Sequence, residues 1–207
     1  TMKRRTTISV FLVLALILLA FPAPASAATT HYVPDDFATI QAAVDGATAG
    51  DTIIVRDGTY TENVDIASGK TGLTIKSENG YATTTVHAAS ASDHVFDVQA
   101  NDVTIGITDH GFSIYGATDS GKAGICLGSG RTGCTIQNNR CGWDANRNKL
   151  GIYLSSSSSN TVSGNTCSYN TNYGILLDSA SNNNTVSGNT CSYNTSYGIY
   201  LYSSSNN

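Results

Sequence analysis

The sequence predicts an all-β protein, a right-handed parallel β-helix with a capping helix at its N-terminal end. Three observations predict this fold class: a polar stretch recurs letter for letter, apolar residues come in short pulses, and one amphipathic segment precedes the pulses. The stretch NTVSGNTCSYNT occupies Asn160–Thr171 and again Asn184–Thr195, with starts 24 residues apart. Self-similarity at a fixed period of roughly 20–50 residues is typical of stacked repeat architectures.

Each repeat contains three short apolar pulses. In one copy they are Val162, then Cys167, then Ile175 with Leu177. Polar neighbours at alternate positions are typical of a strand with one buried face, and Gly, Asn and Ser between the pulses supply turns. Short strands stacked coil on coil predict a single-stranded parallel β-helix over residues 51–207. The rule for parallel crossovers predicts right-handed winding.

The identical letters also predict columns of identical side chains. Residues one coil apart lie directly above one another, at the inter-strand spacing of about 4.8 Å. We therefore expect Asn139, Asn165 and Asn189 to form a ladder in which each side-chain amide bonds the next, as in other stacked sheets. Repetition then replaces a large hydrophobic content, because a solenoid buries apolar residues only through neighbouring coils.

Cysteines follow the same period. The sequence has five, Cys126, Cys134, Cys141, Cys167 and Cys191, and the last three share one column at spacings of 26 and 24 residues. Disulfides are permitted in an exported protein, but three cysteines in one column cannot all pair. Buried thiols in place of aliphatic residues are therefore expected. Such a column would suit copper(I), yet no Met or His accompanies it, so no metal site is expected there.

The first residues predict export. Residues 1–27 combine basic residues at positions 3–5, an apolar run at 8–21 and an A-x-A site at 25–27, which is the pattern of a Sec-type signal peptide. The run is short for a membrane span, so no span is expected after cleavage. Removal of residues 1–27 takes away three of the 11 Lys and Arg residues and none of the 15 Asp and Glu residues. The formal net charge of the remaining chain is then 8 − 15 = −7. That charge argues against a nucleic-acid partner.

Residues 28–50 are expected to form an N-terminal cap. Its core is an amphipathic helix at Phe37–Gly50, capped by Thr39 or Asp36 at its start and by Gly46 or Gly50 at its end. One face of this helix is apolar at 3.6-residue spacing, through Phe37, Ile40, Ala43, Val44 and Ala47. At the other end the chain stops where another NTVSGN would begin. We therefore expect a longer reading frame with further coils or an anchor.

Two stretches resemble a known superfamily. Ala38–Ile66 (ATIQAAVDGATAGDTIIVRDGTYTENVDI) is similar to the opening of pectin-lyase-like proteins. GIYLSSSSSNTVSGNTC, from Gly151, is similar to the parallel β-helix repeats of carbohydrate-binding and sugar-hydrolase (CASH) domains, above all the periplasmic copper-binding NosD type. The resemblance covers roughly residues 32–207 and implies the fold. It implies no single function, because lyases, hydrolases, esterases and non-enzymes share this scaffold.

Most functional residues of the pectin-lyase-like superfamily have no counterpart in this sequence. Gly58, Tyr60 and Glu62 match the G-x-Y-x-E of pectin methylesterases, but that family's downstream catalytic elements have no counterpart. We expect Tyr60 to pack and Glu62 to bond a turn. The best acid–base candidates are Asp109 and His110, because a carboxylate beside an imidazole can tune proton transfer. A turn pair is the competing interpretation, since neighbouring strand residues face opposite sides.

Two further sets of residues are candidate ligand sites. An acidic series could bind Ca²⁺, but its spacing does not repeat and a solvated face is favoured for Asp93, Asp97, Asp102 and Asp109. Outward tyrosines offer apolar area and a polar tip, which suits sugar rings. They could equally well only cover strand edges. The substrate-binding candidates are Tyr153, Tyr169, Tyr193 and Tyr200.

Three functions remain open at this point. The first is a secreted, periplasmic or cell-surface β-helix that binds a polysaccharide or cell-surface glycan, or that is structural or adhesive. The second is a polysaccharide lyase, hydrolase or esterase whose groove lies partly beyond residue 207. The third, implied by the resemblance alone, is a NosD-type copper accessory protein. The residues favour a binding or structural role over catalysis and indicate no cofactor.

Overall fold

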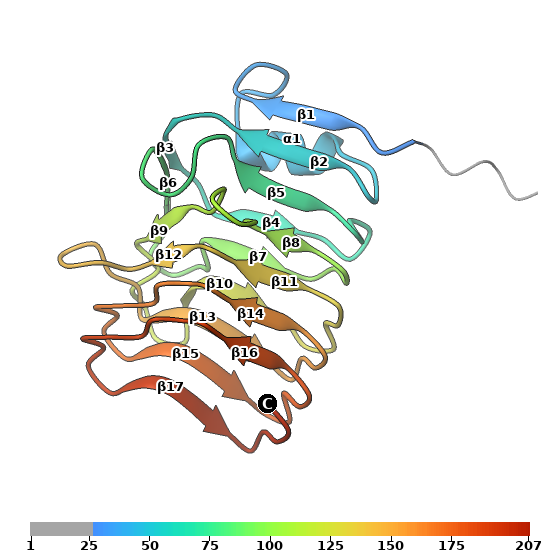
Figure 1. The fold of residues 1–207 in the computed structure, drawn as a ribbon. Helices are drawn as coiled ribbons and strands as arrows, with labels where there is room; N and C mark the ends of the chain where they lie inside the picture. The colour runs from blue at the N-terminus through green and yellow to red at the C-terminus, as the bar shows by residue number, and fades with distance from the viewer. Residues whose placement is uncertain (1–26) are drawn as a thin grey trace, which may run out of the picture.

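The computed structural model describes residues 27–207 and shows a parallel β-helix, as predicted (Figure 1). The strands form three sheets, in which every strand pair is parallel. Sheet A contains β1 (Thr30–Val33), β2 (Thr52–Val55), β5 (Thr74–Ser77), β8 (Thr104–Ile105), β11 (Thr135–Gln137), β14 (Thr161–Ser163) and β16 (Thr185–Ser187). Among the described residues no helix is long and apolar enough to cross a membrane.

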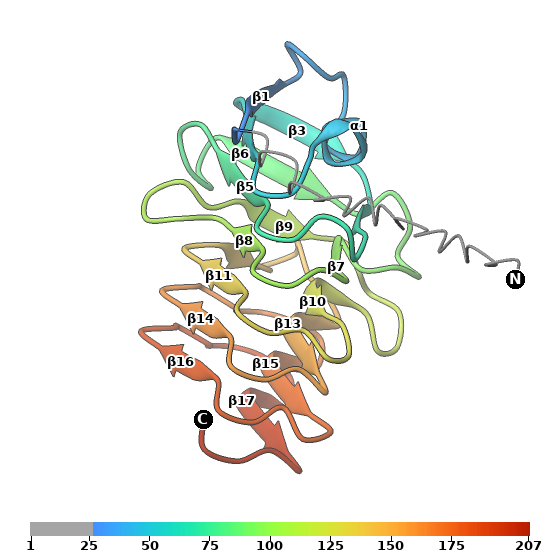
Figure 2. The same ribbon diagram turned by 90° about the vertical axis from the view of Figure 1, so that its right-hand side faces the viewer.

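The other two sheets complete each coil. Sheet B contains β3 (Gly58–Thr61), β6 (Thr84–His87), β9 (Ser113–Tyr115) and β12 (Arg140–Cys141). Sheet C contains β4 (Val64–Ile66), β7 (Phe96–Val98), β10 (Ala123–Leu127), β13 (Leu150–Ser155), β15 (Tyr173–Asp178) and β17 (Tyr197–Tyr202). Figure 2 shows sheets A and C descending along opposite sides of the stack.

Sheet B ends early because the second apolar pulse is shortened in the last coils. There, Thr166 pairs with Arg140 and with Thr190 only through isolated bridges. The prediction of three strands in every coil is therefore wrong for these coils. Asn165 and Asn170 flank this segment, and their amide groups donate to the carbonyl oxygens of Ile136 and Cys141 in the preceding coil.

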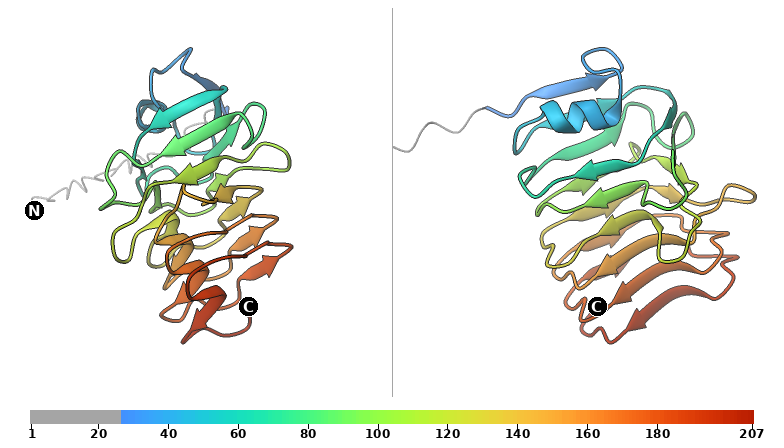
Figure 3. Two further views of the ribbon diagram at one scale, coloured as in Figure 1. Left: turned by 90° about the vertical axis from the view of Figure 1, so that its left-hand side faces the viewer. Right: turned by 180° about the vertical axis from the view of Figure 1, so that it is seen from behind.

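The N-terminal cap differs in detail from the prediction. Helix α1 covers Ile40–Gly46 and is shorter than Phe37–Gly50. Thr39 caps it, since its hydroxyl accepts a hydrogen bond from the Ala42 N–H at 3.1 Å. Phe37 lies before the helix, where its ring would be 2.6 Å from a Cβ added at Gly46. The helix lies beside β1, at the N-terminal end of the stack (Figure 3).

Glu62 has a structural role that the sequence did not specify. Its two carboxylate oxygens accept hydrogen bonds from the N–H groups of Ile40 and Gln41, both at 2.9 Å. These N–H groups have no partner within the helix, and the helix N-terminus favours a negative charge. Tyr60 packs against the core as predicted. The G-x-Y-x-E stretch therefore joins the first coil to the capping helix.

The predicted asparagine ladder is present. The Asn139 N–H donates to Asn165 Oδ1 and the Asn165 N–H donates to Asn189 Oδ1, each at 2.9 Å. The side-chain amides add Nδ2–Oδ1 bonds of 3.3 and 3.0 Å along the same column. Each Nδ2 also reaches a backbone carbonyl, such as Ile136 O at 2.9 Å from Asn165. Buried amides are thus satisfied, which is the condition for burying them without a large cost.

Two further ladders were not predicted. In each, a backbone N–H donates to the asparagine Oδ1 one coil further on, at 2.8 to 3.3 Å. One ladder runs through Asn160, Asn184 and Asn207, and the other runs through Asn148, Asn170 and Asn194. Every corner of the last coils is therefore held by a column of side-chain amides.

The cysteines are free thiols, as expected. Cys141 and Cys167 are fully buried, and Cys191 is partly exposed. Burial raises the pKa of Cys167, and the neighbouring thiols of Cys141 and Cys191 act in the same direction. The predicted signal peptide lies, apart from its last residue, outside the described residues and stays a prediction.

Candidate functional site

The outer face of sheet C carries aromatic side chains on its last three strands. Tyr153, Leu176 and Tyr200 are register partners on β13, β15 and β17, so they form one column. Tyr173 and Tyr197 form a neighbouring column, with rings 5.8 Å apart and nearly parallel at 13°. This face lies outside the solenoid core and forms a second, smaller apolar cluster.

The rings on this face touch one another. Tyr200 lies 5.1 Å from Tyr173, 5.2 Å from Tyr197 and 6.1 Å from Tyr202, between ring centroids. We call Tyr153, Tyr173, Tyr197, Tyr200 and Tyr202 the tyrosine cluster. Tyr197 and Tyr202 are more than half exposed. The cluster therefore presents solvent-accessible aromatic surface on the outer face of sheet C.

A shallow hollow of about 250 Å³ lies within the cluster. It is lined by Tyr173, Leu176, Asp178, Tyr200 and Tyr202. Asp178 accepts a hydrogen bond from the Tyr153 hydroxyl at 3.4 Å and from the Ser179 hydroxyl at 3.0 Å. Burial raises the pKa of Tyr153, and the negative charge of Asp178 acts in the same direction. The phenol therefore stays a neutral hydrogen-bond donor at physiological pH.

The other two predicted tyrosines lie elsewhere. Tyr169 and Tyr193 are turn residues with positive φ angles of 60° and 57°. Their rings stack at 4.8 Å and 24°, and Tyr193 is 76% exposed. The structure thus places Tyr153 and Tyr200 on one face and Tyr169 and Tyr193 on a separate corner, so the four candidates do not form one site.

Asp109 and His110 do not pair in the structure. His110 Nδ1 lies 2.7 Å from the Glu78 carbonyl oxygen, which makes Nδ1–H the donor. No hydrogen bond within residues 27–207 joins the His110 ring to the Asp109 carboxylate. Asp109 is a turn residue with φ of 64° and lines a surface groove. Their acid–base role stays a prediction, and this arrangement gives it no support.

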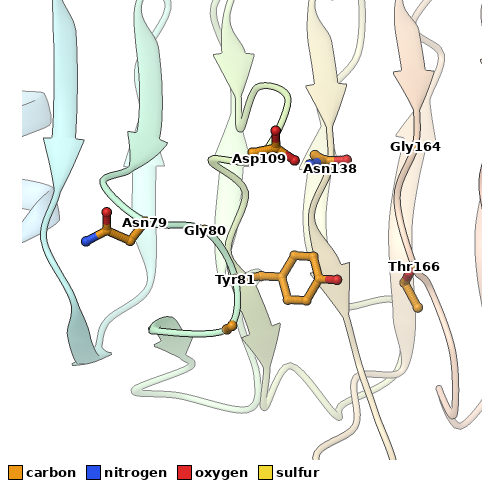
Figure 4. Close-up of a pocket in the computed structure, with 8 residues that line it drawn as sticks. Asn79, Gly80, Tyr81, Asp109, Asn138, Gly164 and Thr166 are labelled. Carbon is orange, nitrogen blue, oxygen red and sulfur yellow. The ribbon is translucent and has the colours of Figure 1, made fainter.

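The groove beside Asp109 was not predicted. It has a volume of about 440 Å³ and follows the corner between sheets A and B (Figure 4). Four coils contribute to it, through Asn79–Ala82, Asp109, Asn138, Gly164 and Thr166. We call it the corner groove. Its residues lie up to 87 positions apart (Asn79 to Thr166), so no local sequence pattern could reveal it.

A second aromatic column on sheet B was also missed. His87 and Tyr115 are register partners whose rings stack at 4.5 Å. Trp143 contacts Tyr115 edge-on at 5.1 Å, and the Arg140 guanidinium lies 4.5 Å from the Trp143 ring centre. These residues satisfy one another and hold a short hairpin, Trp143–Asn146, against the coil. The aromatic rings of this column contact one another and the Arg140 guanidinium, so a structural role suits them.

The absence of a copper site in the cysteine column stays a prediction. Residues 27–207 hold no group of three or more His, Cys, Asp or Glu side chains arranged to bind a metal ion. Burial raises the pKa of Cys167 and so disfavours the thiolate that a soft metal requires, whereas the contact with Cys167 lowers the pKa of Cys191.

Two comparisons place the chain among known proteins. It is 38% identical over 132 residues to a "Cell surface glycoprotein" of Methanothermus fervidus, and this match covers 62% of the chain and 20% of the relative. The chain thus spans about a fifth of the length of that relative. A crystal structure of a pectin methylesterase mutant in complex with a hexasaccharide superposes with a TM-score of 0.53 at 17% identity. This superposition covers 75% of the chain and 55% of the esterase, and it concerns the fold alone.

The chain also matches a protein family over most of its length. Residues 44–207 match the family described as "Periplasmic copper-binding protein (NosD)". Both this description and that of the Methanothermus protein name locations outside the cytoplasm. The match covers most of the chain and includes strands of all three sheets. The chain belongs to the NosD family of parallel β-helix proteins.

Proposed function

We propose that the chain is the β-helix part of a secreted or cell-surface protein that binds a glycan through the tyrosine cluster. The observation that carries this proposal is the contiguous aromatic surface around Tyr200 on the outer face of sheet C. The cell-surface relative and the periplasmic family support a location outside the cytoplasm. That location would bring the cluster into contact with polysaccharides.

The chemistry of the cluster suits a sugar ring. Tyrosine rings offer apolar area to the C–H face of a sugar, and their hydroxyls offer hydrogen bonds at the rim. Asp178 adds a carboxylate that accepts hydrogen bonds from sugar hydroxyls. The hollow of about 250 Å³ is slightly smaller than typical small-molecule sites of about 300–1,000 Å³. It therefore suits one or two units of a polymer rather than an enclosed ligand.

The stacked coils add an advantage for polymers. Register partners recur at the inter-strand spacing of about 4.8 Å, so a ligand that crosses several strands meets the same kind of surface repeatedly. Several weak contacts held at fixed distances raise the overall affinity without any single strong contact. A glycan chain crossing β13, β15 and β17 would contact Tyr153, Tyr173 and Tyr200 in turn.

A glycan array probed with the full chain tests this proposal, followed by calorimetry on the sugars retained. We expect Tyr153→Ala combined with Tyr200→Ala to weaken binding about tenfold or more, because stacking contacts contribute about 0.5–1.5 kcal/mol each. Tyr193→Ala is the matched control, since it removes an exposed tyrosine from a different corner.

Two results would contradict the proposal. Equal losses in the double variant and in Tyr193→Ala would show that the cluster is not the site. Retention of no glycan by the wild-type chain would leave the same stack with a structural or adhesive role. Circular dichroism of each variant shows whether the β-helix is intact. Release of reducing sugar from any retained polymer would favour the enzymatic alternative.

A further inference from the structure

The corner groove gathers side chains from four successive coils. Asn138 and Gly164 follow the register pair Gln137 and Ser163, so they occupy equivalent turn positions one coil apart. Both have positive φ angles, 60° and 64°. Asn138 places a side-chain amide at this turn position, whereas Gly164 in the next coil has no side chain. The groove extends over the space that a side chain at Gly164 would fill. A Cβ added at Gly164 would be 3.4 Å from Asn138 Oδ1.

Polar groups in the groove are unpaired. Within residues 27–207, the side chains of Asp109, Asn138 and Thr166 form no hydrogen bond with protein groups, and neither does the Tyr81 hydroxyl. Asn139, the next residue, behaves in the opposite way, because its buried amide bonds Ile105 O, Gln137 O and Asn165. The inward amide of Asn139 is therefore fully hydrogen-bonded within the protein, whereas the amide of Asn138, which faces the groove, is available to a ligand.

Tyr81 supplies the apolar surface of the groove. It is 43% exposed, and its ring lies between Gly80 and Thr166, below Asp109 and Asn138 (Figure 4). One aromatic ring with a carboxylate, an amide and a hydroxyl around it is a suitable set for a sugar. The tyrosine ring can pack against the C–H groups of a sugar, and the carboxylate and the amide can each form hydrogen bonds with its hydroxyl groups.

The charge of the groove narrows the ligand class. Asp109 is the one charged residue of the lining, and no Lys or Arg contributes to it. Asn79 at the rim is in turn bonded to Asp57 at 3.1 Å, which adds negative charge nearby. An acidic polymer such as a polyuronate would be repelled, whereas an uncharged sugar would not. The volume of about 440 Å³ falls within the range of small-molecule sites.

We propose that the corner groove is a second binding site, which takes a neutral saccharide unit with Tyr81 as its platform and Asp109 and Asn138 as hydrogen-bond partners. It lies between sheets A and B, whereas the tyrosine cluster lies on sheet C. The proposal therefore does not depend on the tyrosine cluster. A neutral polymer could use both sites, but an acidic polymer could use only the cluster.

The turn geometry allows a selective block of the groove. Gly164→Asn would place a side chain in the groove, and the backbone tolerates it because Asn138 has the same conformation at the equivalent position. Gly188→Asn is the matched control. Gly188 has φ of 63° one coil further on, at the position after the register partner Ser187, and it does not line the groove.

The experiment is a titration of the ¹⁵N-labelled full chain, followed by NMR, with the neutral probes cellohexaose, mannohexaose and maltohexaose and with hexagalacturonate. We expect at least one neutral probe to shift the amide signals of Tyr81, Asp109 and Gly164. Tyr81→Ala and Gly164→Asn should each weaken that binding about tenfold or more. Gly188→Asn, and Tyr153→Ala combined with Tyr200→Ala, should leave the groove affinity unchanged.

Three results would overturn the proposal. The first is that no neutral probe shifts the groove signals at millimolar concentration. The second is that hexagalacturonate binds there as tightly as the neutral probes. The third is that Gly164→Asn and Gly188→Asn have equal effects. Because the cluster variants are scored on the same spectra, failure of one site is distinguishable from failure of the other.

Discussion

The first coils and the last coils build the same fold by different means. The first coils are irregular and hold large side chains in the interior, including Phe96, Phe112, Ile53 and Ile75, all fully buried. The last coils repeat every 24 residues and hold no phenylalanine; their buried side chains include Val162, Cys167, Ile175 and Leu177. Their corners instead carry three asparagine ladders. Buried aromatic side chains thus distinguish the first coils, and ordered amides distinguish the last coils.

The difference follows from repetition. An asparagine can bond its counterpart only if the next coil places an asparagine at the same height, so a ladder requires a regular period. The first coils lack that regularity, and their polar groups form individual networks. Asp51, for example, accepts hydrogen bonds from Thr29, Thr48 and His31. A regular period therefore lets a sequence rich in Ser and Asn form a stable stack.

The largest effect is expected from the interior of the first coils. Phe96→Ala removes a fully buried ring that contacts Phe112 at 5.8 Å between centroids, and it should cost about 4 kcal/mol of unfolding free energy. Urea unfolding measures this change. Val162→Ala removes less volume from the last coils and should cost clearly less. Equal costs would show that the two ends do not differ in their dependence on apolar volume.

The next effect concerns the ladders. Asn165→Ala leaves the buried Asn139 N–H without its Oδ1 partner and removes the amide bond to the Ile136 carbonyl. Unpaired buried groups cost about 1–3 kcal/mol each, so we expect a loss of about 3 kcal/mol by urea unfolding. Asn172→Ala is the control, because Asn172 forms one exposed side-chain bond, to Ser196. A loss in Asn165→Ala no larger than in the control would refute the role of the ladder.

The same contrast explains how much could be predicted from sequence. The repeats predicted the parallel β-helix and the ladder through Asn165, because identical letters one period apart must stack. The spacing of 24 also joins Asn160 to Asn184 and Asn170 to Asn194, so the same pattern in the sequence contains the other two ladders. The corner groove was not visible, because Tyr81 and Thr166 meet only after three further coils have wound.

The tyrosine candidates illustrate the same limit. Alternation correctly placed Tyr153 and Tyr200 on the outer face, since a strand fixes the direction of each side chain. Tyr169 and Tyr193 recur just as regularly, but they are turn residues, and a turn directs its side chains by its own φ and ψ angles. Tyr173 and Tyr202 joined the cluster because β15 and β17 are six residues long, longer than the GILL and GIYL motifs indicated.

A smaller effect is expected from the polar network of the first coil. The Thr29 N–H bond holds the pKa of Asp51 well below its ordinary value, helped by bonds from Thr48 and His31. Because the folded-state pKa is depressed, Asp51 stabilises the fold above its unfolded pKa of about 3.9. That contribution is lost as the pH falls through the lower folded value. Asp51→Asn should cost about 2 kcal/mol at pH 7.

The pH dependence separates this network from a general loss of packing. Urea unfolding between pH 7 and pH 2 should show a shallower acid-side decline for Asp51→Asn than for the wild type, because the titrating group is absent. Asp178→Asn is a control, since Asp178 is half-exposed and lies in the last coils. Identical acid-side slopes for the wild type and Asp51→Asn would contradict the role of Asp51.

The smallest effect is expected where the two regions meet. Trp143 belongs to a hairpin inserted between β12 and β13, and it connects Tyr115 of an irregular coil to Arg140 of the first regular one. Trp143→Ala removes an edge-on ring contact and a cation–π contact, so it should cost about 1 kcal/mol. Hydrogen exchange should rise in residues 143–149 and stay unchanged in both end regions. If protection fell throughout the last coils, the hairpin would be a joint on which their stacking depends, and the two regions could no longer be treated as independently stabilised.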